Sequence, residues 1–326
     1  MSEPSAADRR EFLLRVARLG GLSAATLGFG AWLQHRSARP EEPRLLVADR
    51  RTGVAADPTL PELVIAQGDS PAQLVRRAVD ELGGIRRFIA RGDVVVVKPN
   101  IGWDRSAEQA ANTNPEVVAT VVSLCLEAGA RKVVVTDVSC NEPRVCFEHS
   151  GIAAAAKAAG AEVVLPEERR FKEVNLGGDV LTTWPVLEPF MAADKVINLP
   201  IAKHHSLTGC TVGMKNFYGI IGGQRSRLHQ RINESLVDLL AFARPTLTIV
   251  DAYRVLMRGG PTGGSLADVE LRKTILAGTD PVALDAYAAK AWWDLDYQRL
   301  PFLRIAQARG LGKMNFEEVR SKVVNL

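Results

Sequence analysis

Polar and ionisable side chains are concentrated in one stretch of this chain, between positions 198 and 229. Those that could take part in chemistry are Asn198, Lys203, His205, Lys215, Asn216 and His229. A lysine loses its proton more readily once it is removed from water, and a neutral imidazole serves as a base or a metal ligand. We therefore expect His205 and Lys215 to be catalytic, and His205 and His229 to bind a metal. Paired histidines are also common on surfaces and in hydrogen-bonded cores, and that interpretation stays open.

A second group of polar side chains follows the apolar runs that we expect to be strands. They are Lys98, Asn100, Asp137, Asn198, Asp251 and Asp280. In open α/β sheets the ligand crevice lies beyond the carboxyl ends of the strands, so these side chains could converge on one face. The catalytic residues predicted from this group are Lys98 and Asp251. The predicted cofactor-binding residues are Asn100, Lys203, Asn216 and Asp280. Asp and Asn after a strand also cap helices or set turns, which is the simpler alternative for any one of them.

Glycines in the second half of the chain provide backbone that can approach a ligand closely. The run Gly259-Gly260-Pro261-Thr262-Gly263-Gly264 is consistent with a phosphate-binding loop, and we assign Gly263 and Gly264 to cofactor binding. A mobile lid or a plain flexible turn explains the same run equally well. Neither a Walker loop nor a Gly-x-Gly-x-x-Gly motif is present, so nucleotide binding by those routes has no support.

Short apolar runs alternate along the chain with segments that carry helix-capping signals. The expected strands cover 63–67, 94–98, 132–136, 162–165, 196–199, 247–250 and 274–277. Ser70 and Asn114 are each followed by proline and are expected to cap helices. Further helices are expected over 152–159, 235–243 and 281–293. The alternation predicts an α/β fold with a mostly parallel sheet and helices on both faces.

The N-terminal residues have the pattern of a twin-arginine signal. Arg9 and Arg10 precede Phe12-Leu13, and the weakly apolar stretch 19–33 contains several glycines. An amphipathic surface helix is the alternative, but each glycine costs about 1 kcal/mol inside a helix, which disfavours a packed one. We expect export through the twin-arginine translocase to the periplasm. If the signal is not cleaved, residues 19–33 anchor the protein to the periplasmic face of the cytoplasmic membrane.

The expected organisation has three parts, and the signal or anchor comes first. The parts are the signal or anchor over 1–38, a Pro- and Arg-rich linker over 39–61 and one α/β domain over 62–326. The twin-arginine route carries proteins that are already folded. That route suits a protein that acquires a cofactor in the cytoplasm, although rapid folding or a co-transported partner explains it as well.

Composition limits the classes of protein to which the chain can belong. Of its 326 residues, 47% are hydrophobic and 24% are charged, which is typical of globular proteins. The formal net charge is only +4, and part of it comes from arginines near the N-terminus, so a nucleic-acid partner is not expected. The five histidines and four cysteines are scattered, which argues against a zinc finger or an iron–sulfur cluster.

The cysteines are interpreted from their neighbours. Cys140 and Cys146 lie in a segment expected to be a loop, close enough to form a disulfide in an oxidising compartment. The pair could instead ligate metal with His149 or stay unpaired. Cys125 and Cys210 have apolar or glycine-rich neighbours and are expected to be small core residues.

The combined motifs point to a family. The chain resembles the domain of unknown function 362 family over about residues 63–313. The resemblance rests on Lys98-Pro99-Asn100, Thr113-Asn114-Pro115-Glu116, Val196-Ile-Asn198-Leu-Pro200 with Lys203 and His205, Lys215-Asn216-Phe-Tyr-Gly219, Ile249-Val-Asp251, Gly260-Pro261-Thr262-Gly263-Gly264 and Thr279-Asp280-Pro281-Val-Ala-Leu-Asp285. Some family members carry an appended iron–sulfur module, and this chain does not have the cysteines for it.

A more distant similarity is to the nickel-pincer 2-hydroxyacid racemases, in which histidines flank a lysine that anchors a pyridinium-type cofactor. The order His205, Lys215, His229 is similar. This similarity implies a site for a metal or a metal-containing cofactor, and it does not assign racemase activity.

Two classes of function are consistent with these features. The first is an exported, cofactor- or metal-dependent enzyme that acts on a small anionic molecule, with Lys98, His205, Lys215 and His229 around the ligand. The second is a non-catalytic periplasmic binding protein or metallochaperone that holds a metal or cofactor in the same crevice. A turnover assay separates the two classes, because only the enzyme converts its ligand.

Overall fold

The computed structural model of the protein describes residues 54–326, together with Arg10, Leu14, Ala17, Gly20, Gly28–Gly30 and Trp32. These N-terminal positions are helical and belong to a separate unit of the chain, residues 1–44. Arg9 and most of the expected signal and linker lie outside the described residues, so export and anchoring stay predictions. Among the described helices, none has the length and apolar character needed to span a bilayer.

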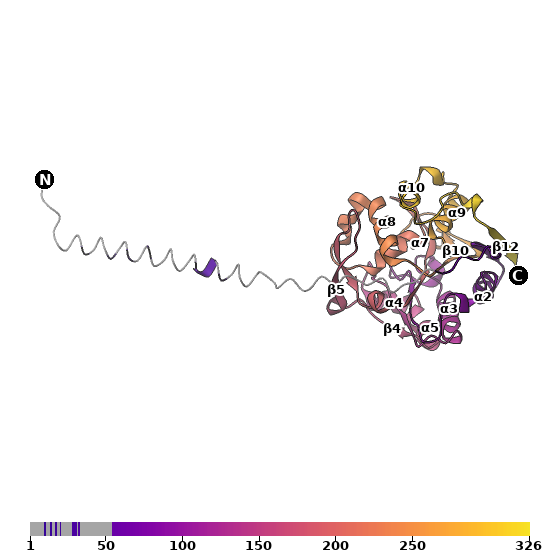
Figure 1. Cartoon of the computed structure of the whole chain (residues 1–326), viewed down its shortest axis with the longest axis horizontal. Helices are drawn as coiled ribbons and strands as arrows, with labels where there is room; N and C mark the ends of the chain where they lie inside the picture. The colour runs from indigo at the N-terminus through magenta and orange to yellow at the C-terminus, as the bar shows by residue number, and fades with distance from the viewer. Residues whose placement is uncertain are drawn as a thin grey trace. The chain divides into compact units, whose positions relative to one another are not determined.

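A mixed sheet forms the centre of the second unit, residues 45–326 (Figure 1). Its strands are β1 (Leu63–Gln67), β2 (Val94–Pro99), β3 (Lys132–Val135), β4 (Glu162–Val163), β7 (Lys195–Leu199), β8 (Ile201–His205), β9 (Gly209–Thr211), β10 (Leu247–Leu256), β11 (Val269–Gly278) and β12 (Ser321–Asn325). A separate hairpin consists of β5 (Phe171–Asn175) and β6 (Thr183–Leu187). Figure 1 shows β5 and β12 on opposite sides of this unit.

The main path through the sheet runs β12-β1-β11-β10-β7-β2-β3-β4. Strands β10, β7, β2, β3 and β4 are parallel to one another, as are β1 and β12. Strand β11 is antiparallel to both of its neighbours, β1 and β10. Off this path, β8 is parallel to β10 and β9 is antiparallel to β8. The sheet is therefore mostly parallel, as the sequence predicted, with β9 and β11 reversed.

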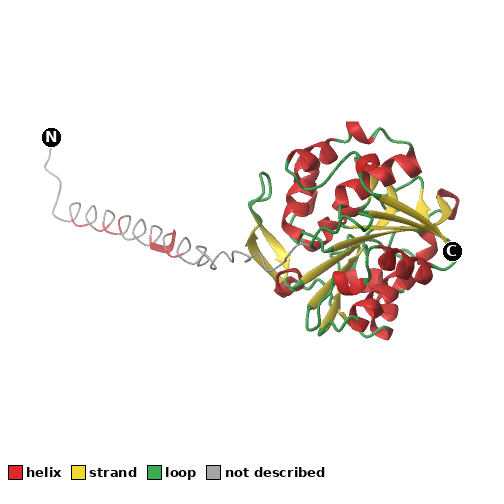
Figure 2. Ribbon diagram, turned by 45° about the vertical axis from the view of Figure 1, so that its right-hand side comes forward, coloured by secondary structure: helices red, strands yellow, loops and turns green. Residues whose placement is uncertain are grey.

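Helices cover both faces of this sheet (Figure 2). One face is covered by α2 (Pro71–Glu81), α3 (Pro115–Glu127), α4 (Pro143–His149) and α5 (Ile152–Ala158). The other is covered by α6 (Pro189–Ala192), α7 (Gly213–Asn216), α8 (Ile232–Ala243), α9 (Pro281–Trp293) and α10 (Pro301–Ala308). Alternate residues of a strand face the two layers, since Val95 and Val97 pack with the first group and Val96 with the second. Because both faces of β2 are buried, its residues form a continuous apolar run from Val94 to Val97.

Two expected helices begin at the predicted capping residues, whereas one strand and one loop differ from the prediction. Ser70 caps α2 by accepting a hydrogen bond from Gln73 N, and the Asn114 side chain accepts one from Glu116 N at the start of α3. Strand β11 begins at Val269, earlier than predicted, because its first half is polar and largely exposed and so carries no apolar run. The segment with Cys146, expected to be a loop, is the helix α4.

The order of the strands places a topological switch point between β2 and β7. From β2 the chain proceeds to β3 and β4 on one side, and it later adds β7 and β10 on the other. Ligands of open α/β sheets bind at such a point, beyond the carboxyl ends of the two strands. In the pairing of β2 with β7, Lys98 lies opposite Asn198. The fold therefore brings two of the predicted strand-end residues to the expected position for a ligand.

Candidate functional site

A pocket of about 460 Å³ lies at this switch point. Its ionisable and aromatic lining residues are Lys98, Trp103, Asp137, Cys140, Lys203, His205, Lys215, Tyr218, Arg225 and His229. Asn100 and Asn216 also line it. The pocket thus holds most of the residues predicted to form a site, from segments far apart in the sequence.

Lys98 and Asp137 form a buried ion pair at the base of the pocket. The Nζ atom of Lys98 lies 2.7 Å from Asp137 Oδ1 and donates to Pro99 O and Asn216 Oδ1, both at 2.8 Å. Burial lowers the pKa of Lys98, and the Asp137 carboxylate opposes that shift. Three acceptors surround an ammonium that has three protons, so none is left for a ligand. This geometry favours a positioning role for Lys98, and the catalytic role stays a prediction.

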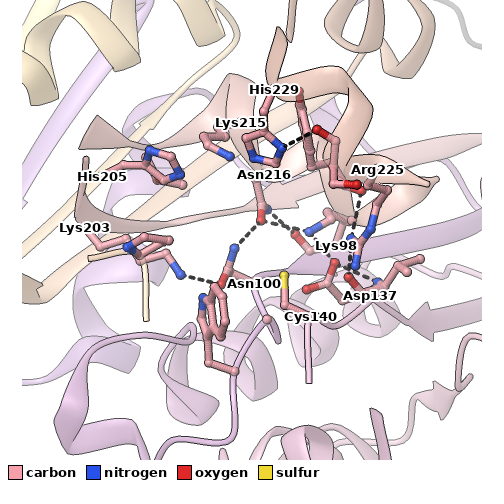
Figure 3. Close-up of a pocket in the computed structure, with 18 of the residues that line it drawn as sticks. Lys98, Asn100, Asp137, Cys140, Lys203, His205, Lys215, Asn216, Arg225 and His229 are labelled. Atoms are coloured by element: carbon pink, nitrogen blue, oxygen red, sulfur yellow. Dashed lines mark hydrogen bonds and ion pairs between the residues drawn. The ribbon is translucent and has the colours of Figure 1, made fainter. Parts of the chain in front are cut away.

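Three asparagines connect Lys98 to Lys203. Asn216 Nδ2 donates to Asn198 Oδ1 at 2.8 Å and to the carbonyl oxygen of Lys98 at 3.0 Å. Asn100 Nδ2 donates to Asn216 Oδ1 at 3.1 Å, and Asn100 Oδ1 accepts from Lys203 Nζ at 3.0 Å (Figure 3). Neutral side-chain amides therefore hold the ammonium groups of Lys98 and Lys203 in place. Because amides carry no net charge, they do not neutralise these ammonium groups.

Lys203 is buried without a carboxylate at ion-pair distance in the described part of the chain. Its Nζ donates to Ala111 O at 2.6 Å as well as to Asn100 Oδ1, which leaves one proton for a ligand. Burial lowers the pKa of Lys203 to about 7. At neutral pH this lysine therefore exists in both protonation states, as a general acid or base requires.

Lys215 lies on α7, with Nζ 4.5 Å from the centre of the Tyr218 ring. Burial lowers the pKa of Lys215 to about 8. Within residues 54–326 no oxygen accepts a hydrogen bond from this ammonium. The short helix is held by Asp285, whose carboxylate accepts from Gly213 N at 2.7 Å and Met214 N at 3.0 Å. A residue of α9 thus fixes the backbone that carries Lys215.

His205 is a neutral hydrogen-bond donor. Its Nδ1 accepts from Leu207 N at 3.1 Å and Thr208 N at 3.4 Å, so the ring proton of the neutral form resides on Nε2. Burial, with the nearby charges of Lys215 and Lys203, lowers the pKa of His205 to about 3. To bind a metal or take a proton at Nε2, the ring would have to move its proton to Nδ1, which faces two N–H groups.

Arg225 supplies a permanent positive charge. It lies in the 3-10 segment Arg225–Arg231, and its guanidinium donates to Val138 O at 2.7 Å and Ser139 O at 2.6 Å. The pocket lining therefore contains three lysines and one arginine against a single carboxylate, Asp137. This imbalance fits an anionic ligand.

Comparison with known proteins identifies the family. Residues 95–290, more than half of the chain, match the family described as Domain of unknown function (DUF362). The chain belongs to the DUF362 family. The resemblance predicted from the motifs around Lys98, Lys203 and Lys215 is confirmed.

Relatives of this DUF362 protein include the thylakoid-associated protein sll1697 of Synechocystis sp. It is 28% identical over 245 residues, which cover 73% of this chain and 74% of that protein. Among solved structures, the lactate racemase apoprotein from Thermoanaerobacterium thermosaccharolyticum has a TM-score of 0.47 and 10% identity, over 75% of this chain and 58% of that one. A Thermotoga maritima protein has a TM-score of 0.39 and 13% identity, over 71% and 60%. The chain spans less than two thirds of either solved chain.

The residues that line the pocket of this DUF362 protein do not form a ready metal site. In the described part of the chain, no three His, Cys, Asp or Glu side chains lie together as metal ligands. His229 lines the pocket but is exposed, with Nδ1 3.2 Å from Ser226 O and its ring 5.8 Å from that of Tyr218. The tautomer of His205 also disfavours ligation. The predicted pairing of His205 with His229 at a metal therefore does not fit these contacts.

Several predicted site residues lie outside the pocket. Asp251 accepts from Asn114 N at 2.7 Å and Tyr253 N at 3.1 Å, and burial raises its pKa to about 6. Asp280 caps α9. Gly263 and Gly264 do not line the pocket, and Gly264 O accepts from Gln109 Nε2. The two carboxylates thus accept backbone N–H groups, which is the alternative that the sequence left open, and the assignment of these four residues to a ligand stays a prediction.

The cysteines agree with the sequence-based expectations only in part. All four lie within residues 54–326, and all are free thiols, so the predicted disulfide between Cys140 and Cys146 is absent. Cys146 is buried on α4, whereas Cys140 is exposed and lines the pocket. Cys125 and Cys210 are buried in the core, as predicted. Cys140 and Arg225 were missed as site residues because no motif marks them.

Proposed function

We propose that this DUF362 protein is an enzyme that binds a small organic anion in the pocket between β2 and β7. One observation carries this proposal: Lys203 is buried and Lys215 half-buried in one pocket, and in the described chain neither has a carboxylate partner. Buried charges are costly unless they are paired. A bound carboxylate or phosphate supplies the missing negative charge.

Proton transfer is the chemistry that these groups support best. Lys203, with a pKa of about 7, and Lys215, with a pKa of about 8, can each exchange a proton near neutral pH. His205 offers a neutral donor at Nε2, and Arg225 a fixed positive charge. Such groups stabilise the negative charge that develops when a proton leaves a carbon next to a carboxylate or carbonyl. We therefore propose proton transfer at carbon as the reaction type.

A hydrogen-exchange assay tests this function whatever the product of the reaction is. The full-length protein is incubated in D₂O with small 2-hydroxy, 2-keto and 2-amino carboxylates, and loss of the α-proton signal is followed by NMR. We expect exchange of at least one compound, and its loss in Lys203→Gln. Binding without exchange would favour the non-catalytic alternative. Mass analysis of natively purified protein shows whether the anion is instead a tightly held organic cofactor.

Ligand binding and stability should depend on pH in opposite directions. We expect oxalate, but not neutral oxamide, to raise the melting temperature at pH 6.5 and to lose this effect by pH 9, as Lys203 and Lys215 lose their protons. Without anion, the free energy of unfolding should rise between about pH 7 and pH 10, because the unfolded chain keeps protons that the folded lysines release. The raised pKa values of Asp251 and Asp285, about 6 and about 7, act in the opposite direction but at lower pH.

Calorimetry at several pH values measures both trends. Equal stabilisation by oxalate at pH 6.5 and pH 9 would show that these lysines do not supply the charge for binding.

We further propose that the enzyme works after export by the twin-arginine route. Replacing Arg9 and Arg10 by lysine keeps the charge but removes the guanidinium pair, so periplasmic protein should fall at least about tenfold. Replacing Arg15 and Arg18 by lysine is the matched control and should leave export unchanged. Cell fractionation with immunoblotting measures both variants. Undiminished export of the Arg9/Arg10 variant would remove the twin-arginine interpretation.

A further inference from the structure

Cys140 is the one exposed thiol of the chain, and the proton chemistry proposed above does not use it. It follows β3, and its backbone N–H donates to Gly102 O at 2.8 Å. Figure 3 shows its sulfur pointing into the space beside Asn100 and Asn216. The thiol of Cys140 lines the same pocket as the ammonium groups of Lys98, Lys203 and Lys215.

An independent observation shows that this space is built for a ligand. The ammonium of Lys203 is buried in the same pocket and keeps one proton unused. The half-buried ammonium of Lys215 also lines this pocket, and no hydrogen-bond acceptor contacts it within residues 54–326. The thiol of Cys140 and these two cations therefore face one volume, and an anion bound there lies next to the sulfur.

We propose that Cys140 is a nucleophile of this pocket, which forms a reversible covalent bond with anionic ligands that carry an electrophilic carbonyl carbon. The inference rests on the proposed function in one respect, that the pocket binds small anions. To that function the inference adds Cys140 as a nucleophile and a covalent bond between its sulfur and the ligand. It also narrows the class of ligand to the small oxo acids.

The covalent step balances without any further reagent. The sulfur of Cys140 adds to the carbonyl carbon, so that a C–S bond forms and the π bond of the carbonyl breaks. The thiol proton passes to the carbonyl oxygen, with neutral Lys203 as the group that can accept and return it, and the product is a hemithioacetal. No oxidant, reductant or leaving group takes part, and the reverse step releases the ligand unchanged.

The burial of the other cysteines makes the test selective. Cys125, Cys146 and Cys210 are buried, so alkylation of the native protein reports Cys140 alone. The full-length protein is treated with iodoacetamide in the presence of glyoxylate or glycolate, and labelling of Cys140 is measured by peptide mass spectrometry. Both compounds are small monoanions, but only glyoxylate has a carbonyl carbon. We expect glyoxylate to protect Cys140 at roughly tenfold lower concentration than glycolate, and dialysis to reverse the protection.

The outcomes separate the thiol from the anion site. Equal protection by the two compounds would overturn the role of Cys140 while leaving anion binding intact, and protection by neither would overturn both. Protection that borohydride makes permanent marks an imine on a lysine, which also overturns the thiol bond. In Lys203→Gln the preference for glyoxylate should fall to less than about threefold, whereas Lys157→Gln, on the exposed side of α5, should keep it.

Discussion

Arginine in place of Lys215 is expected to abolish retention of the anionic ligand while the domain still folds. The ammonium of Lys215 is compact, half-buried and close to the Tyr218 ring, and its pKa of about 8 lets it release a proton. A guanidinium is larger and permanently protonated, so it fills the space of the ligand and cannot act as an acid or base. The α-proton exchange rate should fall by about 100-fold or more, which is typical for loss of a general acid or base.

Three measurements on natively purified protein check this expectation: bound-ligand mass, oxalate affinity and melting temperature. Lys157→Arg makes the same change at an exposed position of α5 and should match the wild type in all three. Equal ligand content in Lys215→Arg and wild type would discard Lys215 as a ligand-binding group. A large loss of melting temperature would instead show that Lys215 serves the fold.

Much of the fold could be predicted because the buried parallel strands are continuous apolar runs. Val94–Lys98 is such a run, and both faces of β2 are covered by helices. The polar half of β11 has no comparable signal, since residues such as Glu270 and Arg272 are exposed and only its second half enters the core. Strand β12 joins the sheet beside β1 through long-range pairing that no local pattern encodes.

The candidate site was only partly predictable, for two physical reasons. Capping carboxylates and ligand-binding carboxylates have the same sequence signature, so Asp251 and Asp280 could not be told from site residues before their N–H partners were known. The role of His205 depends on which ring nitrogen accepts a hydrogen bond, and a sequence does not contain that information. Lys203 and Lys215 were found because they lie in a stretch of concentrated polar and ionisable residues that follows an apolar strand.

Gly219 shows how closely the backbone supports this site. A Cβ atom built on Gly219 would overlap Asp137 Oδ1 and would lie 2.7 Å from Lys98 Nζ. Asp137 cannot move away freely, because its other oxygen accepts from Ile101 N at 2.5 Å and its Oδ1 also accepts from Val138 N at 2.9 Å. The absence of a side chain at Gly219 therefore makes room for the buried ion pair.

Gly219→Ala is accordingly expected to destabilise the protein by about 3–5 kcal/mol, the usual cost of breaking a buried ion pair. Lys98 would lose its counter-charge, and the asparagine chain that starts at Asn216 would lose its anchor, so oxalate binding should fall as well. The control is Gly102→Ala in the same pocket, where the new Cβ meets only Asn100 Oδ1, at 3.4 Å. It should change stability by less than about 1 kcal/mol. Urea unfolding followed by circular dichroism measures both variants, and equal stabilities would show that the ion pair adjusts to the extra methyl group.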